Sequence, residues 1–394
     1  MYQQYLKKIL LFLLLFSFPL CGNWLFLLNC GELLPIEDIV EKQLSSNQYL
    51  VVGLATRNQG YYYKKAMVTQ LKPEILVLGS SRVMQFRSEF FNKTMVNAGG
   101  AMSSINEGYS FIKESFQTAL PKVVILGLDY WWFNQNATPP LREVKPPHLL
   151  SHKIALQNYL LPFKWLATQK IPFSFYLKQL NPFKEKFRDG IGVDGILNKN
   201  GFGPDGSHVY TKVINGKEKS DDEKFVSSLN YIEHHGPHFE WGDKINDVHF
   251  QQFLEMIQFL QTRNIKIILF IPPLAPSVVT KMHQFSQEYA FIDDLKKRLQ
   301  QTGLPFYDFH DAMISGITDC EFVDGTHGGE IAYAKILTAI AQKDNQIQSL
   351  LNRRYLASVI RTYQNHAMVP KSNLNSLPEV DFLHIGCEKL ALRN

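Results

Sequence analysis

The chain has few cysteines and no motif typical of a metal centre. Its 394 residues include only four cysteines, and no two of them form a Cys-x-x-Cys pair. No His-Glu-x-x-His sequence or other metal-ligand spacing occurs, which disfavours a zinc-dependent deacetylase. Cys320 and Cys387 could pair in an oxidising compartment, although their positions in the sequence do not establish the necessary geometry.

Positive charge is present but is not concentrated. The formal net charge is +5 at pH 7, and the basic clusters, such as Arg353-Arg354, are short and form no aromatic-basic repeat. A nucleic-acid-binding groove needs a concentrated basic surface, so nucleic acid is not expected as a partner. The charge balance supports only a weak affinity for anionic lipid or acidic polysaccharide.

The amino terminus has the pattern of a membrane anchor. The twenty residues from Ile9 to Leu28 carry no charge, and as a helix they would be about 30 Å long, which matches the hydrocarbon core of a bilayer. Lys7 and Lys8 precede this run and acidic residues follow it, an asymmetry that places the rest of the chain outside the cytoplasm. A cleavable signal peptide is the alternative, but no small-x-small cleavage site follows the run. The predicted order is a cytoplasmic tail at 1–8, a transmembrane signal anchor at 9–28 and a stem at 29–61.

Beyond the stem, patterns typical of buried strands alternate with helical patterns. Such alternation is typical of a doubly wound parallel sheet. We predict a flavodoxin-like, three-layer α/β/α fold with a five-stranded parallel sheet, preceded by one transmembrane helix. The expected strands are 75–79, 94–97, 122–128, 265–271 and 305–309, and the expected helices are 62–71, 83–91, 105–119, 247–263, 289–301 and 330–342.

Two segments do not follow this alternation. Residues 139–246 are rich in Pro, Gly, Lys and aromatic residues and form an insertion within the predicted domain, 62–345. An insertion of this length is expected to cover the active face as a lid or substrate surface, or else to be a partly disordered elaboration. Residues 346–394 form a carboxyl-terminal extension to which the sequence assigns no role.

The first candidate site residue follows the first buried strand. The apolar run from Ile75 ends at Gly79-Ser80-Ser81. Open α/β sheets bind ligands at the carboxyl edge of their strands, and helix amides there can stabilise an anion. Ser81 is therefore a candidate nucleophile, with Ser80 as the second choice. The same residues also suit an ordinary turn and helix cap.

An aspartate and a histidine precede the last predicted helix of the domain, in the sequence Asp324-Gly-Thr-His327. A tight turn at this point would let Asp324 hold one ring nitrogen of His327 and leave the other nitrogen free to act as a base. A helix cap beside a surface histidine is the alternative interpretation.

Together, Gly79-Ser80-Ser81 and Asp324-Gly-Thr-His327 resemble the first and last sequence blocks of the SGNH (GDSL-type) hydrolase family. The resemblance extends over about residues 65–345 and is to membrane-anchored members that acylate or deacylate cell-surface polymers, such as the D-alanyl transfer and alginate acetylation proteins. It implies that Ser81 attacks an ester, that His327 is the general base and acid, and that Asp324 fixes the histidine tautomer. It implies neither a metal nor a cofactor.

The resemblance also implies hydrogen-bond donors for an oxyanion. Gly100 is the best match to the glycine amide of the second block. Relatives read Gly-x-Asn-Asp after the central strand, where this chain reads Gly127-Leu-Asp-Tyr130. Because an ionised aspartate cannot donate a hydrogen bond, either Asn97 supplies the missing donor or Asp129 accepts a bond from a substrate hydroxyl.

Three further residues are candidates for substrate contact. Trp131 and Trp132 belong to a run of four aromatic residues directly after a strand. Exposed rings of this kind stack on sugars, although at least two of the four are expected to be buried. Arg82, beside Ser81, could position an anionic substrate group, or could pair on the surface with Glu89 or Glu107.

These features predict a membrane-anchored, extracytoplasmic (periplasmic) serine esterase or O-acyltransferase. Its expected substrates are acylated glycans or small acyl esters, and a membrane-bound acyltransferase is a candidate partner. The alternative is a non-catalytic protein of the same fold that binds polysaccharide or assists its assembly. Asp129 in the third block favours the alternative, whereas the joint presence of Ser81, Asp324 and His327 favours the enzyme.

Overall fold

The chain divides into two compact units. The computed structural model describes residues 2–56, 60–136, 156–181, 183, 185–371 and 378–389. One unit comprises residues 1–59 and 148–204, and the other comprises residues 60–147 and 205–394. Each unit is described separately below.

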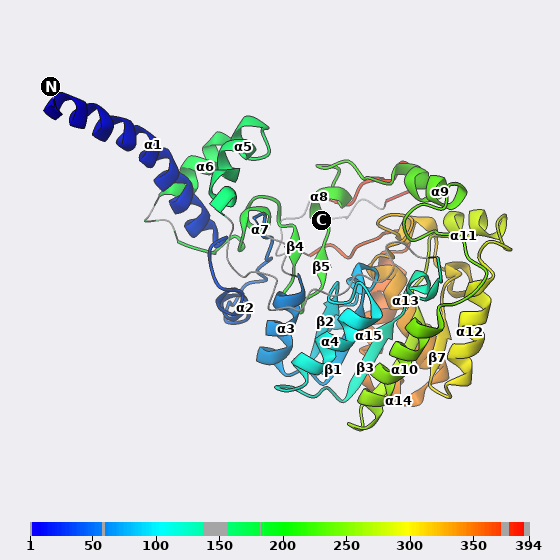
Figure 1. Cartoon of the computed structure of the whole chain (residues 1–394). Coiled ribbons are helices and arrows are strands. Elements are labelled where there is room, and N and C mark those ends of the chain that lie inside the picture. Colours follow the sequence, from blue (N-terminus) through cyan, green and yellow to red (C-terminus); the bar gives the residue numbers. More distant parts are fainter. Residues whose placement is uncertain are drawn as a thin grey trace. The chain divides into compact units, whose positions relative to one another are not determined.

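The first unit joins the amino-terminal segment to part of the predicted insertion (Figure 1). The end of α1 (Tyr2–Cys30) packs against α5 (Leu161–Ala167) and α6 (Phe173–Leu180). The unit also contains α2 (Ile36–Leu44), α7 (Val193–Asn198) and β4 (Gly201–Phe202). The apolar cluster at its centre consists of Phe26, Leu27, Cys30, Trp165, Ile171, Tyr176 and Val193.

A buried carboxylate fixes the same connection. Glu32 is fully buried, and its side chain accepts hydrogen bonds from the amides of Ala55 (2.9 Å), Thr56 (3.1 Å) and Val193 (2.8 Å). Val52 also forms β-bridges with Ile191 and Phe202. The predicted stem and half of the predicted insertion, which were expected to be separate parts, therefore fold together.

The predicted membrane anchor lies within α1. The side chains of residues 9–18 are outside the part of the chain that the structure describes. Among the described residues, no helix has both the length and the apolar character needed to cross a membrane.

The second unit is built on the predicted parallel sheet. Its five strands are all parallel and lie in the order β2-β1-β3-β6-β7, which is 2-1-3-4-5 when numbered along the chain. Every residue of the three strands β1, β2 and β3 is buried, as expected for strands covered on both faces. The strand bounds are β1 (Ile75–Gly79), β2 (Met95–Gly99), β3 (Val123–Gly127), β6 (Lys266–Ile271) and β7 (Phe306–Asp308).

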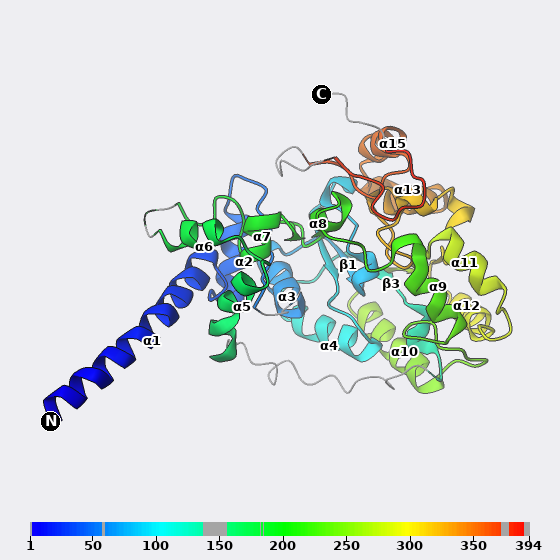
Figure 2. The same cartoon turned by 90° about the horizontal axis from the view of Figure 1, so that it is seen from above.

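Helices cover both faces of this sheet (Figure 2). In this view α3 (Gly60–Leu71), α4 (Ile105–Ser115) and α10 (Asp247–Gln261) lie along one side, and α13 (Glu330–Lys343) lies with α15 (Arg353–Thr362) along the other. The unit also contains β5 (His208–Val209), α8 (Thr211–Ile214), α9 (Val226–Glu233), α11 (Pro276–His283), α12 (Phe291–Gln301) and α14 (Asn345–Leu350). The expected helices at 105–119, 247–263, 289–301 and 330–342 are thus present within a few residues of their predicted bounds.

The predicted helix at 83–91 is wrong. Two short 3-10 turns, η1 (Ser81–Val83) and η2 (Ser88–Phe90), replace it. The reason is that the side chain of Asn97 donates hydrogen bonds to backbone carbonyls that helical N–H groups would otherwise occupy. The amide nitrogen of Asn97, a fully buried residue of β2, donates to the carbonyls of Val83 and Phe86, both at 2.9 Å. In a helix, backbone N–H groups would satisfy such carbonyls.

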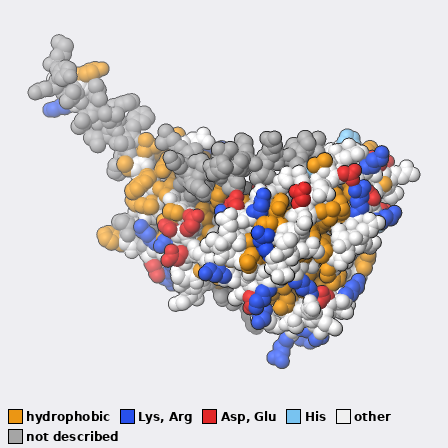
Figure 3. All heavy atoms as spheres, turned by 60° about the horizontal axis from the view of Figure 1, so that its bottom comes forward, with side chains coloured by type: hydrophobic (Ala, Val, Ile, Leu, Met, Phe, Trp, Pro, Cys, Tyr) orange, Lys and Arg blue, Asp and Glu red, His pale blue; other side chains and the backbone are white. Residues whose placement is uncertain are grey.

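Surface charge agrees with the dispersed pattern in the sequence. On the face drawn in Figure 3, Lys and Arg side chains are interspersed with Asp and Glu side chains. Mixing of both signs at this range produces no broad field of one sign.

Candidate active site

Ser81 lies at the carboxyl edge of the sheet, two residues after β1 ends. Ser80 has extended backbone angles (φ −72°, ψ −169°), and its hydroxyl accepts a hydrogen bond from the amide of Arg82 at 3.2 Å. This is the cap that the sequence allowed as the ordinary interpretation. It belongs to Ser80, so the hydroxyl of Ser81 remains available for other contacts.

The loop before α13 presents an aspartate and a histidine to Ser81. Asp324 Oδ1 accepts from the amides of Thr326 and His327, both at 2.8 Å, which closes a tight turn. A β-bridge between Phe322 and Gly328 closes the base of the loop. The residue types explain this shape, because aspartate side chains commonly bond to backbone amides two or three residues further on.

Three side chains form a continuous chain of hydrogen bonds. Ser81 Oγ lies 2.7 Å from His327 Nε2, and His327 Nδ1 lies 2.7 Å from Asp324 Oδ2. An ionised carboxylate only accepts hydrogen bonds, so Nδ1 carries the ring proton and Nε2 of neutral His327 accepts from the Ser81 hydroxyl. The structure thus brings together the three residues that the sequence proposed, while their catalytic roles stay predictions.

The electrostatics of the pair suit a histidine base. Burial alone would lower the pKa of His327, but the charge and hydrogen bond of Asp324 outweigh it, so that the pKa of His327 is raised. Burial likewise would raise the pKa of Asp324, yet the charge of His327 and the hydrogen bonds from its ring and from nearby amides hold that pKa well below its usual range. Asp324 therefore stays ionised and supports a positive charge on His327.

The predicted oxyanion donors are used elsewhere, so both assignments are wrong in this structure. The side-chain nitrogen of Asn97 already donates to two backbone carbonyls. The amide of Gly100 donates to the carbonyl of Gly79 at 3.0 Å. Gly100 has the positive φ (81°) that glycine tolerates best, which explains why glycine occupies this turn. Among the described residues, the Ser81 amide donates to no backbone carbonyl outside its own turn, so it is the remaining candidate for an oxyanion donor.

The sequence suggested that Arg82 positions an anionic substrate group. The structure contradicts this, because Arg82 is buried. Its guanidinium pairs with Asp129 (Nη1–Oδ1 3.1 Å), and both side chains are 1% exposed. Its remaining groups donate to the carbonyls of Thr326 (3.0 Å), Pro272 (2.8 Å) and Pro273 (2.8 Å). Neither Glu89 nor Glu107 is its partner. Thr326 belongs to the loop of residues 322–328 that carries His327, called the histidine loop below. Arg82 therefore connects the segment that carries Ser81 to the segment that carries His327.

Asp129 is likewise inaccessible to substrate. Burial raises its pKa, and the charge of Arg82 opposes that shift without cancelling it. A fully buried carboxylate cannot reach a substrate hydroxyl, so the predicted substrate contact of Asp129 is wrong. Its function in the fold is to receive the guanidinium of Arg82.

The aromatic run does not form an exposed sugar-binding surface. All four residues of η3 (Tyr130–Phe133) are buried, with Trp131 9% and Trp132 4% exposed. The Trp131 ring lies between the Arg82 guanidinium, 5.0 Å from its centroid, and the His238 ring at 4.5 Å. Substrate contact by Trp131 and Trp132 is therefore contradicted, because both rings are buried and that of Trp131 packs against Arg82.

One buried ion pair and one buried hydrogen bond near the site could not be read from the sequence. Arg87 is fully buried, and its Nε donates to Glu330 Oε1 at 2.7 Å. Tyr333 donates its hydroxyl hydrogen to the carbonyl of Arg82. These partners are separated by 243 and 251 residues, so no local pattern indicates them. Glu330 and Tyr333 both lie in the first turn of α13, directly after the histidine loop.

The site contains no evident metal centre. Among the described residues, no group of three or more His, Cys, Asp or Glu side chains could hold a metal ion.

Comparison of the sequence with models of protein families finds no match, and comparison with curated proteins finds none either.

Proposed function

We propose that this protein is a serine esterase or O-acyltransferase of the SGNH type. The observation that carries the proposal is the hydrogen-bonded chain Ser81–His327–Asp324 at the carboxyl edge of a parallel sheet. The strand order 2-1-3-4-5 supports it, because flavodoxin-like folds have this order and bind ligands at the same edge, beside the first strand.

In the proposed reaction, His327 Nε2 takes the hydroxyl proton of Ser81 while Oγ attacks the carbonyl carbon of an ester. The tetrahedral intermediate then loses the alcohol, which receives the proton from His327, and an acyl-Ser81 ester remains. Water or a glycan hydroxyl next gives its proton to His327 and attacks this ester. Ser81 recovers its proton as the carboxylic acid or the new ester leaves.

Stabilisation of the oxyanion is the weaker part of this site. The Ser81 amide is an available donor, whereas Asn97 and Gly100 are not. Loss of a single donor lowers the rate by about two to three orders of magnitude in a well-studied protease. We therefore expect slow turnover of simple esters, as suits transfer to a bound acceptor better than rapid hydrolysis.

We also propose an extracytoplasmic location on the cytoplasmic membrane. The uncharged run 9–28 and the lysines that precede it support this location. The disulfide between Cys320 and Cys387 supports it as well, because disulfides persist in oxidising compartments. In that setting acylated surface glycans are the proposed substrates, and a membrane-bound acyltransferase is the proposed donor partner.

Two observations favour a second function: the donors of Asn97 and Gly100 are already used within the fold, and the aromatic rings of η3 are buried. A non-catalytic protein that binds or helps assemble polysaccharide would keep this fold without needing an oxyanion site. In that case Ser81, His327 and Asp324 would form only a structural hydrogen-bond network.

Intact-mass spectrometry with p-nitrophenyl acetate separates the two functions. The proposed enzyme gains the mass of one acetyl group, and Ser81→Ala does not. Ser80→Ala, a change of the same size one residue earlier, retains the adduct. An adduct that persists in Ser81→Ala, or a wild-type protein that never forms one with several acyl esters, would overturn the enzymatic proposal.

A further inference from the structure

The end of α1 packs against protein over part of the run that the sequence predicts to lie in the membrane. Phe26 and Leu27, both within the uncharged run 9–28, are fully buried. The Phe26 ring stacks on that of Tyr176 in α6, with 4.9 Å between the centroids. In Figure 1, α5 and α6 lie beside the last turns of α1, and α2 lies beyond its end. One face of the predicted anchor is therefore covered by the first unit.

The same contact supplies hydrogen bonds to a buried polar residue of α1. Asn23 is fully buried. Its side chain donates to the carbonyl of Tyr159 and accepts from the hydroxyl of Tyr176, both at 2.9 Å. Tyr159 belongs to η5 (Leu156–Leu160), the turn before α5. A polar side chain is costly in hydrocarbon unless it finds a partner, so these bonds allow this part of α1 to lie at membrane depth.

The length of α1 limits how the first unit can meet a bilayer. If α5 and α6 stayed outside the membrane, the part of α1 that they cover, from Asn23 onward, would stay outside as well. Only residues 9–22 would then remain, and a helix of this length extends about 21 Å, against a hydrocarbon core of about 30 Å. With residues 23–28 included, the run reaches the full thickness. The helices packed on this part of α1 then lie at the depth of the lipid headgroups.

The exposed surface around this contact is apolar. Large apolar side chains with 39–63% of their surface exposed come from α1, η5, α5 and α6, and we call them the apolar face: Leu20, Trp24, Leu160, Phe163, Phe173 and Leu177. Leu20 and Trp24 are four residues apart and so share one side of α1. Apolar side chains exposed together on neighbouring helices mark an interaction surface.

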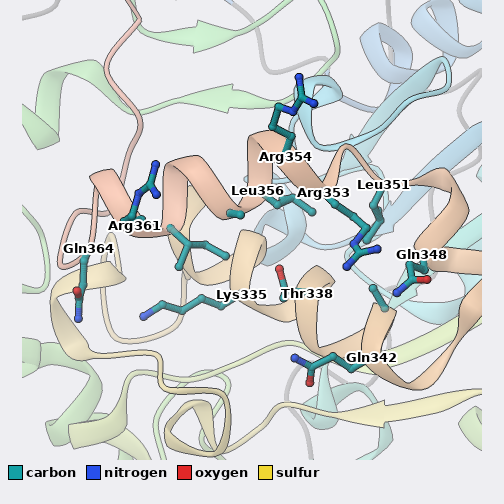
Figure 4. A pocket seen from close by; sticks show the side chains of 13 residues that line it. Lys335, Thr338, Gln342, Gln348, Leu351, Arg353, Arg354, Leu356, Arg361 and Gln364 are labelled. Atoms are coloured by element: carbon teal, nitrogen blue, oxygen red, sulfur yellow. The ribbon is translucent and has the colours of Figure 1, made fainter.

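Two hollows of the molecule lie elsewhere. One, beside Asn29 and Gln179 of the first unit, has a volume of only about 10 Å³. The other is a groove of about 810 Å³ between α13, α14 and α15 of the second unit (Figure 4). Neither is lined by a residue of the apolar face. A small molecule bound in either hollow would therefore leave the apolar face exposed.

The charge of this region suits phospholipid headgroups. Residues 156–181 include Lys164, Lys170 and Lys178, all exposed, and contain no Asp or Glu. Lysine side chains can reach headgroup phosphates while their apolar neighbours lie deeper. Contact with the same face of a second copy would instead bring like charges together. The charge therefore favours a lipid surface over self-association.

We propose that the apolar face, with η5, α5 and α6, lies in the outer headgroup layer of a phospholipid bilayer, beside the point where α1 leaves the membrane. Its rings and leucines enter the upper acyl region, to a depth of about 5–10 Å as in other interfacial helices, and its lysines contact phosphates. The inference rests on the proposed membrane location and not on the proposed reaction. Part of the insertion, predicted to be a lid or substrate surface, would then contact the membrane.

Fluorescence of the full chain in vesicles of phosphatidylethanolamine and phosphatidylglycerol tests this contact. The environment-sensitive dye NBD is attached without reductant, so that the Cys320–Cys387 disulfide stays intact. Wild type is labelled at the exposed Cys21 of α1, which reports whether α1 has entered the bilayer. Cys21→Ser/Leu177→Cys moves the label to α6. The control, Cys21→Ser/Glu41→Cys, moves it to an exposed position of α2.

The label at Leu177 should emit at a shorter wavelength than the label at Glu41. A lipid with a nitroxide near the top of its acyl chain should quench the Leu177 label at least about half as strongly as the Cys21 label, and should not quench the Glu41 label. Cys21→Ser/Phe173→Cys should repeat the result for Leu177. Cys21→Ser alone measures any labelling of the buried Cys30.

Quenching at Cys21 without quenching at Leu177 and Phe173 would overturn the proposal and leave the membrane location standing. No quenching at Cys21 would overturn the location itself. Equal quenching at Glu41 would show that the contact is not specific to the apolar face. A blue-shifted Leu177 label that the lipid nitroxide does not quench would assign the face to a protein partner instead. Acetyl-adduct formation at Ser81, measured in detergent, tests the enzymatic proposal separately from all these outcomes.

Discussion

Arg82 and Asp129 form a buried ion pair directly behind the candidate nucleophile, with 3.1 Å between Nη1 and Oδ1. The pair joins the residue after Ser81 to the loop after β3. The same guanidinium donates to the carbonyl of Thr326, which precedes His327. The position of the histidine relative to the serine therefore depends on a charged group that substrate cannot reach.

Arg82→Met is expected to destabilise the protein strongly. It leaves Asp129 as a buried carboxylate without its cation, and breaking a buried pair in this way costs about 3–5 kcal/mol. Arg82→Met/Asp129→Leu should recover part of this loss, because it removes both charges. Urea unfolding of the two variants measures the difference.

Lys122→Met is the matched control for this experiment. Lys122 pairs with Glu74 at 2.7 Å, but its side chain is 76% exposed, and exposed pairs contribute little. If Arg82→Met were no more destabilising than Lys122→Met, the buried pair would not hold the loops together.

Asn97→Ala separates a structural role from a catalytic one. Asn97 donates to the carbonyls of Val83 and Phe86. Its loss should lower the unfolding free energy by about 1–3 kcal/mol, because the Phe86 carbonyl loses its donor and the Val83 carbonyl keeps only the amide of Phe86 at 3.4 Å. The rate of acetyl-adduct formation per folded molecule should stay within about tenfold of wild type. An oxyanion donor would instead cost about 100- to 1,000-fold.

Asn92→Ala provides the comparison on the same segment. Asn92 is exposed and donates to the carbonyl of Leu351 at 2.8 Å, so its removal should affect stability only slightly. A loss of rate confined to Asn97→Ala, with stability unchanged, would restore the oxyanion role to Asn97.

The sheet and the Asp324–His327 turn were predicted from the sequence for physical reasons that act locally, whereas their combination with Ser81 was predicted from the resemblance of two distant segments to one family. β1 and β3 are short, wholly apolar runs, and Asp324 and His327 belong to one tight turn. The contacts around the site, in contrast, join residues that are distant from one another in the sequence. Arg82 directly follows Gly79-Ser80-Ser81 and reads as a surface cation, yet its partners are contributed by three distant loops.

Asn97 shows the same limit. An asparagine two residues before a pair of glycines suggests a donor that faces a ligand, and only the path of residues 83–86 reveals that its donors are already used. The aromatic run at 130–133 suggested exposed rings because its neighbours in space, including His238, are not its neighbours in the sequence.

Activity should rise with pH as His327 loses its proton, because only neutral Nε2 can accept the proton of Ser81. The pKa of His327 is raised by Asp324, so the midpoint of this rise should lie above the ordinary histidine value of about 6.5. Asp324→Asn removes the charge that favours the protonated ring. The midpoint should then move to lower pH, and the rate should fall because the tautomer is no longer fixed.

The initial rate of p-nitrophenol release across pH 5–9 measures both midpoints. Asp319→Asn is the control, since Asp319 is in the preceding η8 turn (Asp319–Glu321) and bonds to Ser277 rather than to His327. Identical midpoints in wild type and Asp324→Asn would show that Asp324 does not set the protonation of the base.

The Cys320–Cys387 disulfide should stabilise the histidine loop as well as the whole unit. Cys320 lies four residues before Asp324, and the bond closes a loop between positions 67 residues apart. Closing a loop of this length contributes about 4 kcal/mol by restricting the unfolded chain. Lys389, two residues after Cys387, donates to the carbonyl of Cys320 at 3.1 Å, so the tail is attached by a polar contact beside the disulfide. Cys320→Ser/Cys387→Ser should therefore lower the Tm by several degrees and should also slow acetyl-adduct formation, because the turn that carries Asp324 loses a covalent support. Dithiothreitol should have the same effect on wild type and none on the double variant.

Cys21→Ser, which changes an exposed free cysteine in α1, should leave both measurements unchanged. If dithiothreitol lowered the Tm of wild type but left the adduct rate intact, the disulfide would support the fold without supporting the site.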